Sequence, residues 1–275
     1  MLTRVDVRNN RGDLFTLVLD DPSSGYIVAD IDGLGPVKAN LVSSSFAGMD
    51  GEQYQSSRRG ARNIQFKLEL DPDPATDTVW SLRDRLYDFF MPKLQVTMQF
   101  FREDGLVVEI PGVVETCDPD HFAQEPTMDI SVMCFRPVDF YELSSRVLSS
   151  LLTTDTEPTY FDYEGTSETG VIFELTTDRS VDELTIYHHT PTGEIQTLTY
   201  DNAPLIAGDA LIISTVSGDK WAALNRAGTI SSVLYGISPQ SKWIELQRGI
   251  NGIRAYATGT PISVTMEYVT RYGGL

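Results

Sequence analysis

The sequence predicts a mainly β protein of two domains with a single α-helix. Only one stretch, residues 74–91, keeps a helical period over its whole length, and most of the remainder alternates like strands between turns. The chain of 275 residues also exceeds one average domain. We therefore expect residues 1–140 to form a β-barrel or sandwich that carries the helix, and residues 141–275 to form a second β-sandwich.

The predicted helix, residues 74–91, has apolar side chains spaced by three and four residues, which places them on one face. Asp73 can cap its N-terminus, and Pro74 suits the first helical position because its missing N–H is not needed there. Pro92 ends the helix, since proline cannot continue it. The apolar face has to lie on a sheet. That face consists of Val79, Leu82, Leu86, Phe89 and Phe90.

The first half of the chain predicts an antiparallel sheet around this helix. Its segments alternate apolar and polar residues and are separated by turns rich in Gly, Asp, Asn and Pro. The expected strands are residues 5–7, 14–19, 26–31, 38–46, 64–70, 94–101, 106–110, 113–117 and 128–135.

Residues 47–60 have three glycines and almost no apolar content. A stretch of this length and composition predicts a long loop or a β-arm. Arg58, Arg59 and Arg62 form the only basic cluster of the chain. They are either solvated charges near a loop tip, or part of an arm that docks on acidic groups of a neighbouring subunit.

The second half predicts strand after strand at the spacing of a sandwich. The expected strands are residues 171–176, 183–188, 195–200, 210–215, 221–225, 243–247, 254–258 and 262–268. Two aromatic side chains, Trp221 and Trp243, are candidates for stacking on a sugar or a partner. The alternative is that Trp243 turns inward as part of the core.

The net charge of −18 argues against stable binding of nucleic acid or of an anionic membrane. No apolar run is long enough to span a bilayer, and the charged first ten residues do not suggest a signal peptide. The two cysteines, Cys117 and Cys134, suggest buried thiols rather than a disulfide framework. We expect a protein made in a reducing cytoplasm.

Enzyme signatures are missing from the sequence, and we predict no catalytic, cofactor-binding or metal-binding residues. His188 and His189 are adjacent on a predicted strand, so they face opposite sides and cannot share a metal. The segment from Asp118 to His121 could offer a metal ligands, but Asp-Pro-Asp is more typical of a turn.

Several segments in a fixed order resemble the distal tail protein (Dit) family of siphoviruses, the bacteriophages with long, non-contractile tails. These segments are residues 31–36, 48–51, 58–62, 64–70 and 134–137 in the first half, and 207–209, 212–215, 241–246 and 249–251 in the second. The resemblance covers nearly the whole chain.

This resemblance implies a structural protein that forms a hexameric ring at the tail tip. The ring would connect the tail tube to the host-adsorption apparatus and leave a channel for DNA. Residues 1–140 would then be a tail-tube-like domain with residues 47–60 as an inter-subunit arm, and residues 141–275 a galectin-like sandwich whose last strand can pack on the first domain.

The partners implied are the tail-tube protein, the tape-measure protein and the baseplate hub or tail-fibre proteins. The protein would be made in the host cytoplasm and reside in the virion. Two other classes stay open from the residues alone, namely a carbohydrate-binding module that uses Trp221 or Trp243 and a tail-associated hydrolase.

For the ring hypothesis, the acidic composition of the chain has a physical reason. An acidic channel would let DNA slide without sticking.

Overall fold

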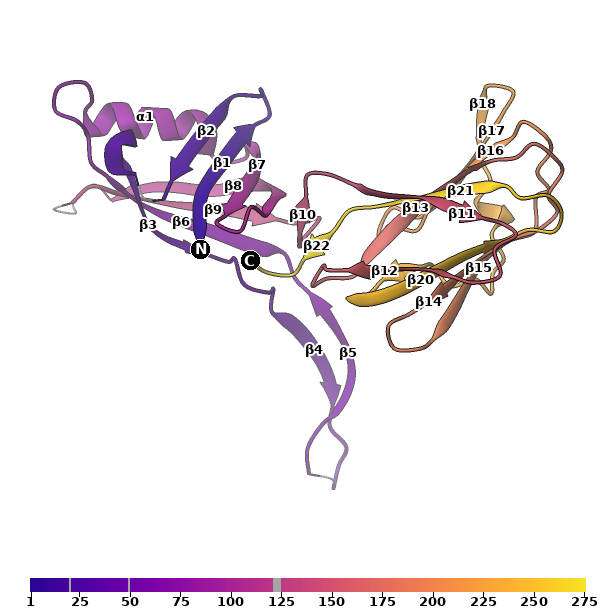
Figure 1. Ribbon diagram of the computed structural model, residues 1–275. Helices are drawn as coiled ribbons and strands as arrows, with labels where there is room; N and C mark the ends of the chain where they lie inside the picture. Colours follow the sequence, from indigo (N-terminus) through magenta and orange to yellow (C-terminus); the bar gives the residue numbers. More distant parts are fainter. Residues whose placement is uncertain (20, 49, 121–124) are drawn as a thin grey trace. The chain divides into compact units, whose positions relative to one another are not determined.

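The computed structural model describes residues 1–19, 21–48, 50–120 and 125–275, so His121 lies outside the described residues. The chain divides into two compact units (Figure 1). The first unit comprises residues 1–143 and 272–275, and the second comprises residues 144–271. The described part of the chain contains no helix long and apolar enough to cross a membrane.

A nine-stranded sheet forms the first unit, in the order β2-β1-β7-β8-β9-β6-β3, with β10 paired to β8 and β22 paired to β10. The described strands end at β2 and β3 without closing into a barrel. The bounds are β1 Leu2–Asn9, β2 Leu14–Val18, β3 Tyr26–Asp32, β6 Arg62–Leu70, β7 Gln95–Arg102, β8 Val107–Asp120, β9 Thr127–Cys134, β10 Phe140–Glu142 and β22 Arg271–Tyr272. A short 3-10 turn, η1 (Pro22–Ser24), precedes β3.

One face of this sheet is apolar and packs under the single helix, α1 (Val79–Phe90) (Figure 1). The burial of β6 alternates residue by residue, with Ile64, Phe66 and Leu68 turned toward the helix. From the helix, Leu82, Leu86 and Phe90 complete this core and are fully buried. The predicted apolar face of the helix is thereby confirmed.

The helix begins later than predicted, at Val79 instead of Pro74. Asp73 does not cap it, because its side chain accepts from Ala75 N at 2.9 Å and closes a separate turn. Thr78 is the N-cap, and a reciprocal bond pair joins it to Ser81. A serine at the third helical position supplies the return bond that glutamate or glutamine usually makes.

We expect Thr78→Ala to lower the free energy of unfolding by about 1 kcal/mol, the usual cost of losing an N-cap. The matched control is Thr76→Ala, which changes an exposed threonine of the preceding turn. Chemical denaturation of both variants checks the expectation. Equal effects of the two substitutions would mean that the cap contributes nothing.

The segment predicted as two strands, residues 106–110 and 113–117, is a single long strand, β8. Pro111 is tolerated inside it because this part of β8 is paired on one side only. Pro111 lies opposite Thr97 of β7, whereas pairing with β9 begins at Val113. A proline without its N–H can occupy a strand position where no ladder bond is required.

The second unit is a sandwich of a seven-stranded sheet and a four-stranded sheet. The first has the order β11-β21-β13-β16-β17-β18, with β19 paired to β13, and the second the order β12-β20-β14-β15. Their bounds are β11 Arg146–Leu152, β12 Thr159–Tyr163, β13 Thr169–Thr176, β14 Leu184–His189, β15 Ile195–Tyr200, β16 Ala210–Ser214, β17 Trp221–Arg226, β18 Thr229–Ser232, β19 Glu245–Leu246, β20 Gly249–Tyr256 and β21 Ser263–Tyr268. A 3-10 turn, η2 (Leu234–Gly236), follows β18.

A single core lies between the two sheets of this unit. Phe173 and Ile213 enter it from the larger sheet, and Ile186 and Leu198 from the smaller one. The predicted β-sandwich is thus present, although the predicted strand 243–247 shrinks to the two residues of β19. The mainly β fold class with one α-helix is confirmed.

Candidate assembly interface

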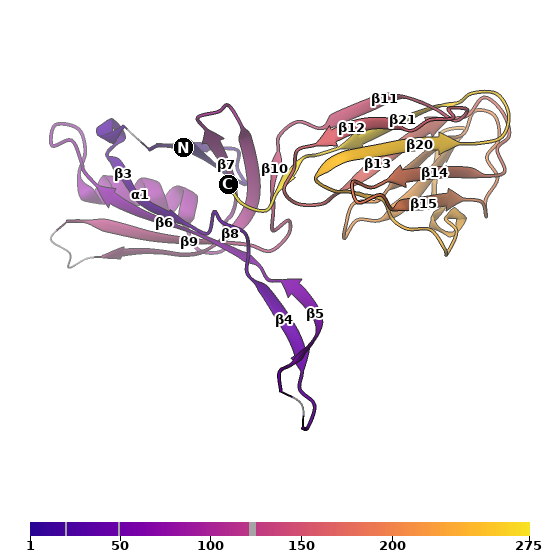
Figure 2. The same cartoon turned by 60° about the horizontal axis from the view of Figure 1, so that its bottom comes forward.

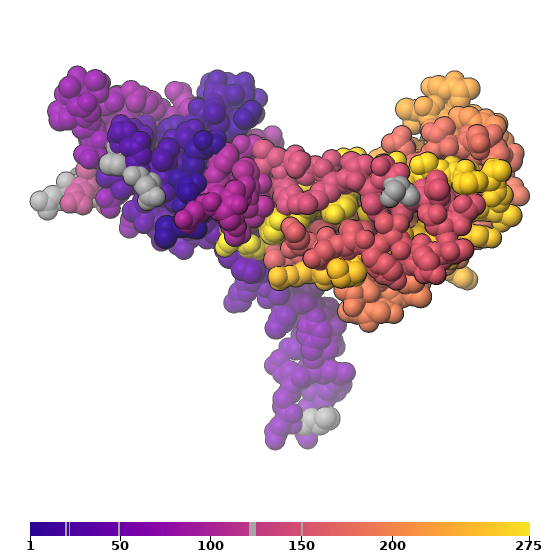
Figure 3. All heavy atoms as spheres, in the orientation of Figure 1, coloured from indigo at the N-terminus to yellow at the C-terminus, as the bar shows by residue number. Residues whose placement is uncertain are grey.

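An exposed hairpin, which we call the arm, leaves the sheet of the first unit between β3 and β6 (Figures 1 and 2). Its strands are β4 (Ala39–Ser44) and β5 (Gln53–Arg59), which pair only with each other. Part of the predicted loop 47–60 is therefore a strand. Every residue of β5 is exposed, and in Figure 3 the atoms of the arm stand apart from the body of the first unit.

The arm exposes apolar side chains to solvent on its flanks. Leu41 is 69% exposed and Tyr54 is 60% exposed. Tyr54 donates to Ser57 Oγ at 2.8 Å, and Ser57 lies opposite Leu41, so these three side chains share one face. Phe46 lies near the tip and is also exposed. Apolar side chains gathered on an exposed hairpin are typical of a surface that a partner covers.

At the base of the arm, Arg59 forms a bidentate ion pair with Asp139. Its two terminal nitrogens lie 2.5 and 2.8 Å from the two carboxylate oxygens. The Asp139 side chain is buried, while Arg59 is about half exposed. This pair fixes the last residue of β5 to the segment before β10.

Arg62 is enclosed by its own chain and is the largest of the fully buried side chains among the residues that the structure describes. Its guanidinium donates to four backbone carbonyls at 2.6–2.7 Å, those of Gly33, Gly35, Val138 and Gly273. Its carbon Cζ also lies 4.4 Å from the centre of the Phe140 ring. Burial lowers the pKa of Arg62 from its ordinary value, yet so basic a group stays charged.

These bonds join three distant parts of the first unit at the base of the arm. They connect the turn before β4, the segment before β10 and the C-terminal residues, where Leu275 N also donates to Leu34 O at 3.0 Å. Gly33 is required in this turn because its φ is +85° and a Cβ would lie 1.8 Å from Asn63 O. The base is therefore a rigid platform for the arm.

The three arginines predicted as one interface cluster thus have three different environments. Arg62 is buried and donates four hydrogen bonds within its own chain, so its role here is to hold the base of the arm. Arg59 is held by Asp139. Arg58 is exposed, and within the described residues it has no ion-pair or hydrogen-bond partner for its side chain.

The sheet face opposite α1 is polar and is richer in carboxylates than in cations. Strand alternation and register place these side chains there, with Asp30 opposite Lys67 and Glu109 accepting from Gln99 at 2.9 Å. The carboxylates include Asp6, Asp30, Asp32, Glu69, Glu109, Asp118 and Asp129, and the cations include Arg4, Arg8 and Lys67.

The tryptophans of the second unit are not fully exposed platforms. Trp221 and Trp243 are both partly buried, and Trp243 packs against the core. Lys220 Nζ lies 5.6 Å from the centre of the Trp243 ring. Trp243 is thus neither a fully exposed stacking platform nor a fully buried core anchor, and a ligand-binding role for it stays a prediction.

The described residues contain no group of three or more His, Cys, Asp and Glu side chains placed to hold a metal. His188 is buried, and its Nε2 donates to Asn251 Oδ1 at 2.9 Å. Both cysteines are unpaired and buried, and burial raises the pKa of each thiol to about 12. Thiols with so high a pKa are poor nucleophiles at neutral pH.

The family model described as the C-terminal domain of the siphovirus-type tail component matches residues 164–272. The solved structure of the Dit protein of phage SPP1, described as a paradigm of hub adsorption apparatus in phages infecting Gram-positive hosts, superposes with a TM-score of 0.66 at 14% identity, covering 97% of this chain and 98% of that one. Comparison with curated protein sequences found no match.

Two structures of the phage p2 baseplate in its activated conformation are also similar. The one with Ca has a TM-score of 0.46 at 9% identity and covers 100% of both chains. The one with Sr has a TM-score of 0.45 at 9% identity and covers 99% of both. The SPP1 structure is therefore the one that defines the shared fold.

Proposed function

We propose that this chain is a structural protein of a phage tail tip, a proposal supported by the match of residues 164–272 to the siphovirus-type tail component and by the fold shared with SPP1 Dit. Its role is to hold other tail proteins in place, without catalysis. The observation that carries the proposal is the exposed arm on its rigid base, within a fold shared with SPP1 Dit over nearly the whole chain. In this role the protein resides in the virion after synthesis in the host cytoplasm.

The assembly is a ring of six copies, in which the arm of one subunit packs on the next. Heterologous contacts of this kind close into a ring when the rotation between neighbours fits. The apolar face of the arm, with Leu41 and Tyr54, supplies the buried part of the contact. Arg58 supplies a free cation to a neighbouring chain that is strongly acidic.

The ring encloses a channel for DNA, and the polar face of the nine-stranded sheet lines it. The surplus of carboxylates on this face supports the assignment, because negative side chains do not retain phosphates. The two open faces of the ring contact the tail-tube and tape-measure proteins on one side and the hub or fibre proteins on the other.

A triple variant, Leu41→Ser with Tyr54→Ser and Arg58→Ser, tests the arm. All three side chains are exposed, so we expect a folded protein with an unchanged melting temperature that no longer forms rings. Ile230→Ser is the matched control, since Ile230 is 73% exposed and belongs to the second unit. Light scattering on a sizing column measures the solution mass of both variants. An intact ring in the triple variant would overturn the role of the arm.

A further inference from the structure

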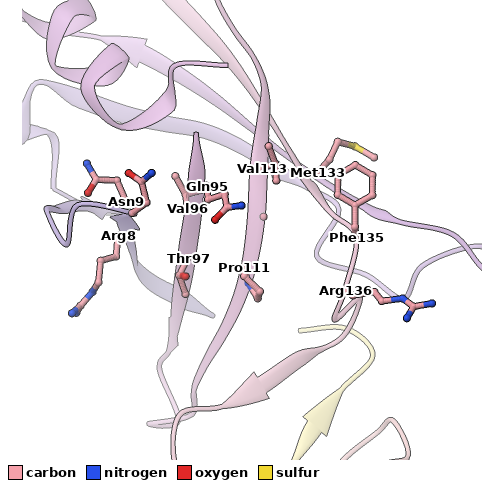
Figure 4. A pocket seen from close by; sticks show the side chains of 12 residues that line it. Arg8, Asn9, Gln95, Val96, Thr97, Pro111, Val113, Met133, Phe135 and Arg136 are labelled. Carbon is pink, nitrogen blue, oxygen red and sulfur yellow. The ribbon is translucent and has the colours of Figure 1, made fainter. Parts of the chain in front are cut away.

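A pocket of about 350 Å³ opens on the polar face of the first unit's sheet, and no residue of the arm lines it (Figure 4). The inference drawn from it rests on the proposed function, because this face is the one assigned to the channel wall. Strands β1, β7 and β8 and the end of β9 surround it. Gln95 projects between β7 and β8, and Arg8 and Arg136 lie at opposite sides (Figure 4). The pocket is therefore framed by regular strands, which hold its shape.

Two of the lining side chains are arginines without an internal partner. The first unit contains ten arginines. Only Arg8, Arg58 and Arg136 have no ion pair, side-chain hydrogen bond or ring contact within the described residues, and two of these three line this pocket. An exposed guanidinium presents a fork of five donors that fits a carboxylate.

None of the residues that line the pocket is acidic. This is unusual on a chain with a net charge of −18. The remaining polar side chains include the amides of Asn9, Asn10 and Gln95. The pocket thus combines positive charge with neutral donors.

An apolar wall completes the pocket. Phe135 is 60% exposed although it is a large aromatic residue, and Met133 lies beside it (Figure 4). Aromatic, methionine and arginine side chains are enriched at protein-binding surfaces, and here an exposed phenylalanine and a partly buried methionine lie next to an arginine. A ligand that satisfies the pocket therefore carries both carboxylates and an apolar side chain.

We propose that this pocket binds a short acidic segment of another protein, with its carboxylates on Arg8 and Arg136 and an apolar side chain against Phe135. The carboxylates on the sheet outside the pocket favour a short acidic peptide over a nucleic acid. A phosphate backbone extending from the pocket would meet Glu109 and Asp129 on the same sheet face, whereas a short peptide ends within the pocket.

The test is fluorescence anisotropy of the full chain with the labelled three-residue peptide Asp-Phe-Asp, which is short enough to end within the pocket. Arg8→Glu and Arg136→Glu should each weaken binding at least tenfold, because each breaks a charge-assisted hydrogen bond. Arg248→Glu is the matched control, since it makes the same charge change at an exposed arginine of the second unit whose side chain has no partner within the described residues. It should leave the affinity within about twofold, as expected for a charge outside the pocket that salt screens.

Three outcomes would overturn the proposal. The first is equal binding of a peptide with asparagine in place of aspartate. The second is equal weakening by Arg248→Glu, which would reveal attraction to net charge alone. The third is tighter binding of a labelled single-stranded oligonucleotide than of the peptide. The Arg8→Glu and Arg136→Glu variants should still assemble into rings. A failure of the peptide-binding proposal can therefore be distinguished from a failure of the ring proposal.

Discussion

Arg62→Met should lower the free energy of unfolding of the first unit by about 3–5 kcal/mol, the range for breaking a buried charged interaction. Methionine keeps much of the volume of the side chain but donates no hydrogen bond. Four backbone carbonyls would lose their donor together, and the turn before β4 would separate from the C-terminal residues. The base of the arm would lose its support.

Hydrogen exchange read by mass spectrometry resolves this effect, because it reports peptides of the first unit separately from those of the second. Arg58→Met is the control, since it removes an exposed arginine near Arg62 in sequence and should change stability by less than about 0.5 kcal/mol. A loss below about 1 kcal/mol for Arg62→Met would show that the four bonds do not stabilise the fold.

Leu86→Ala should destabilise the first unit by about 2–5 kcal/mol, because it removes buried methyl groups and leaves a cavity. Leu86 is fully buried between α1 and the sheet, as is Leu82, for which we expect the same range. Asp84→Ala provides the control on the exposed side of the same helix. Denaturant unfolding measures all three, and changes below about 0.5 kcal/mol at both leucines would mean that this face is not core.

The helix shows where periodicity predicts well and where local chemistry decides. The apolar spacing identified the buried face and the proline after Met91 identified the end. The start was wrong because two competing caps stand five residues apart. Asp73 uses its carboxylate to close a turn, and Thr78 and Ser81 bond reciprocally, a difference that residue preferences do not reveal.

The strands missed by the sequence reading lack the alternation that marks a half-buried sheet. All residues of β18 are exposed, and β11 carries no clear apolar period, so pairing with neighbours defines them instead. In β8 the proline hid a continuous strand, because its effect depends on which side is paired. Which side of a strand is paired becomes known only from the assembled sheet.

The same limit applies to the candidate interface. The sequence placed Arg58, Arg59 and Arg62 in one basic cluster, but it could not show that Arg62 meets Gly273, which is 211 positions away. The pocket around Arg8 and Arg136 was not foreseen, since its residues come from four segments of the first unit.

The solution mass of the purified full chain tests the central proposal most directly. Light scattering on a sizing column, with electron microscopy of the same peak, should give six times the chain mass of 30.6 kDa and a ring with six-fold symmetry. The triple arm variant should shift that peak to one chain mass. A wild-type protein that stays at one chain mass at every concentration, with no rings in the micrographs, would contradict the ring assembly.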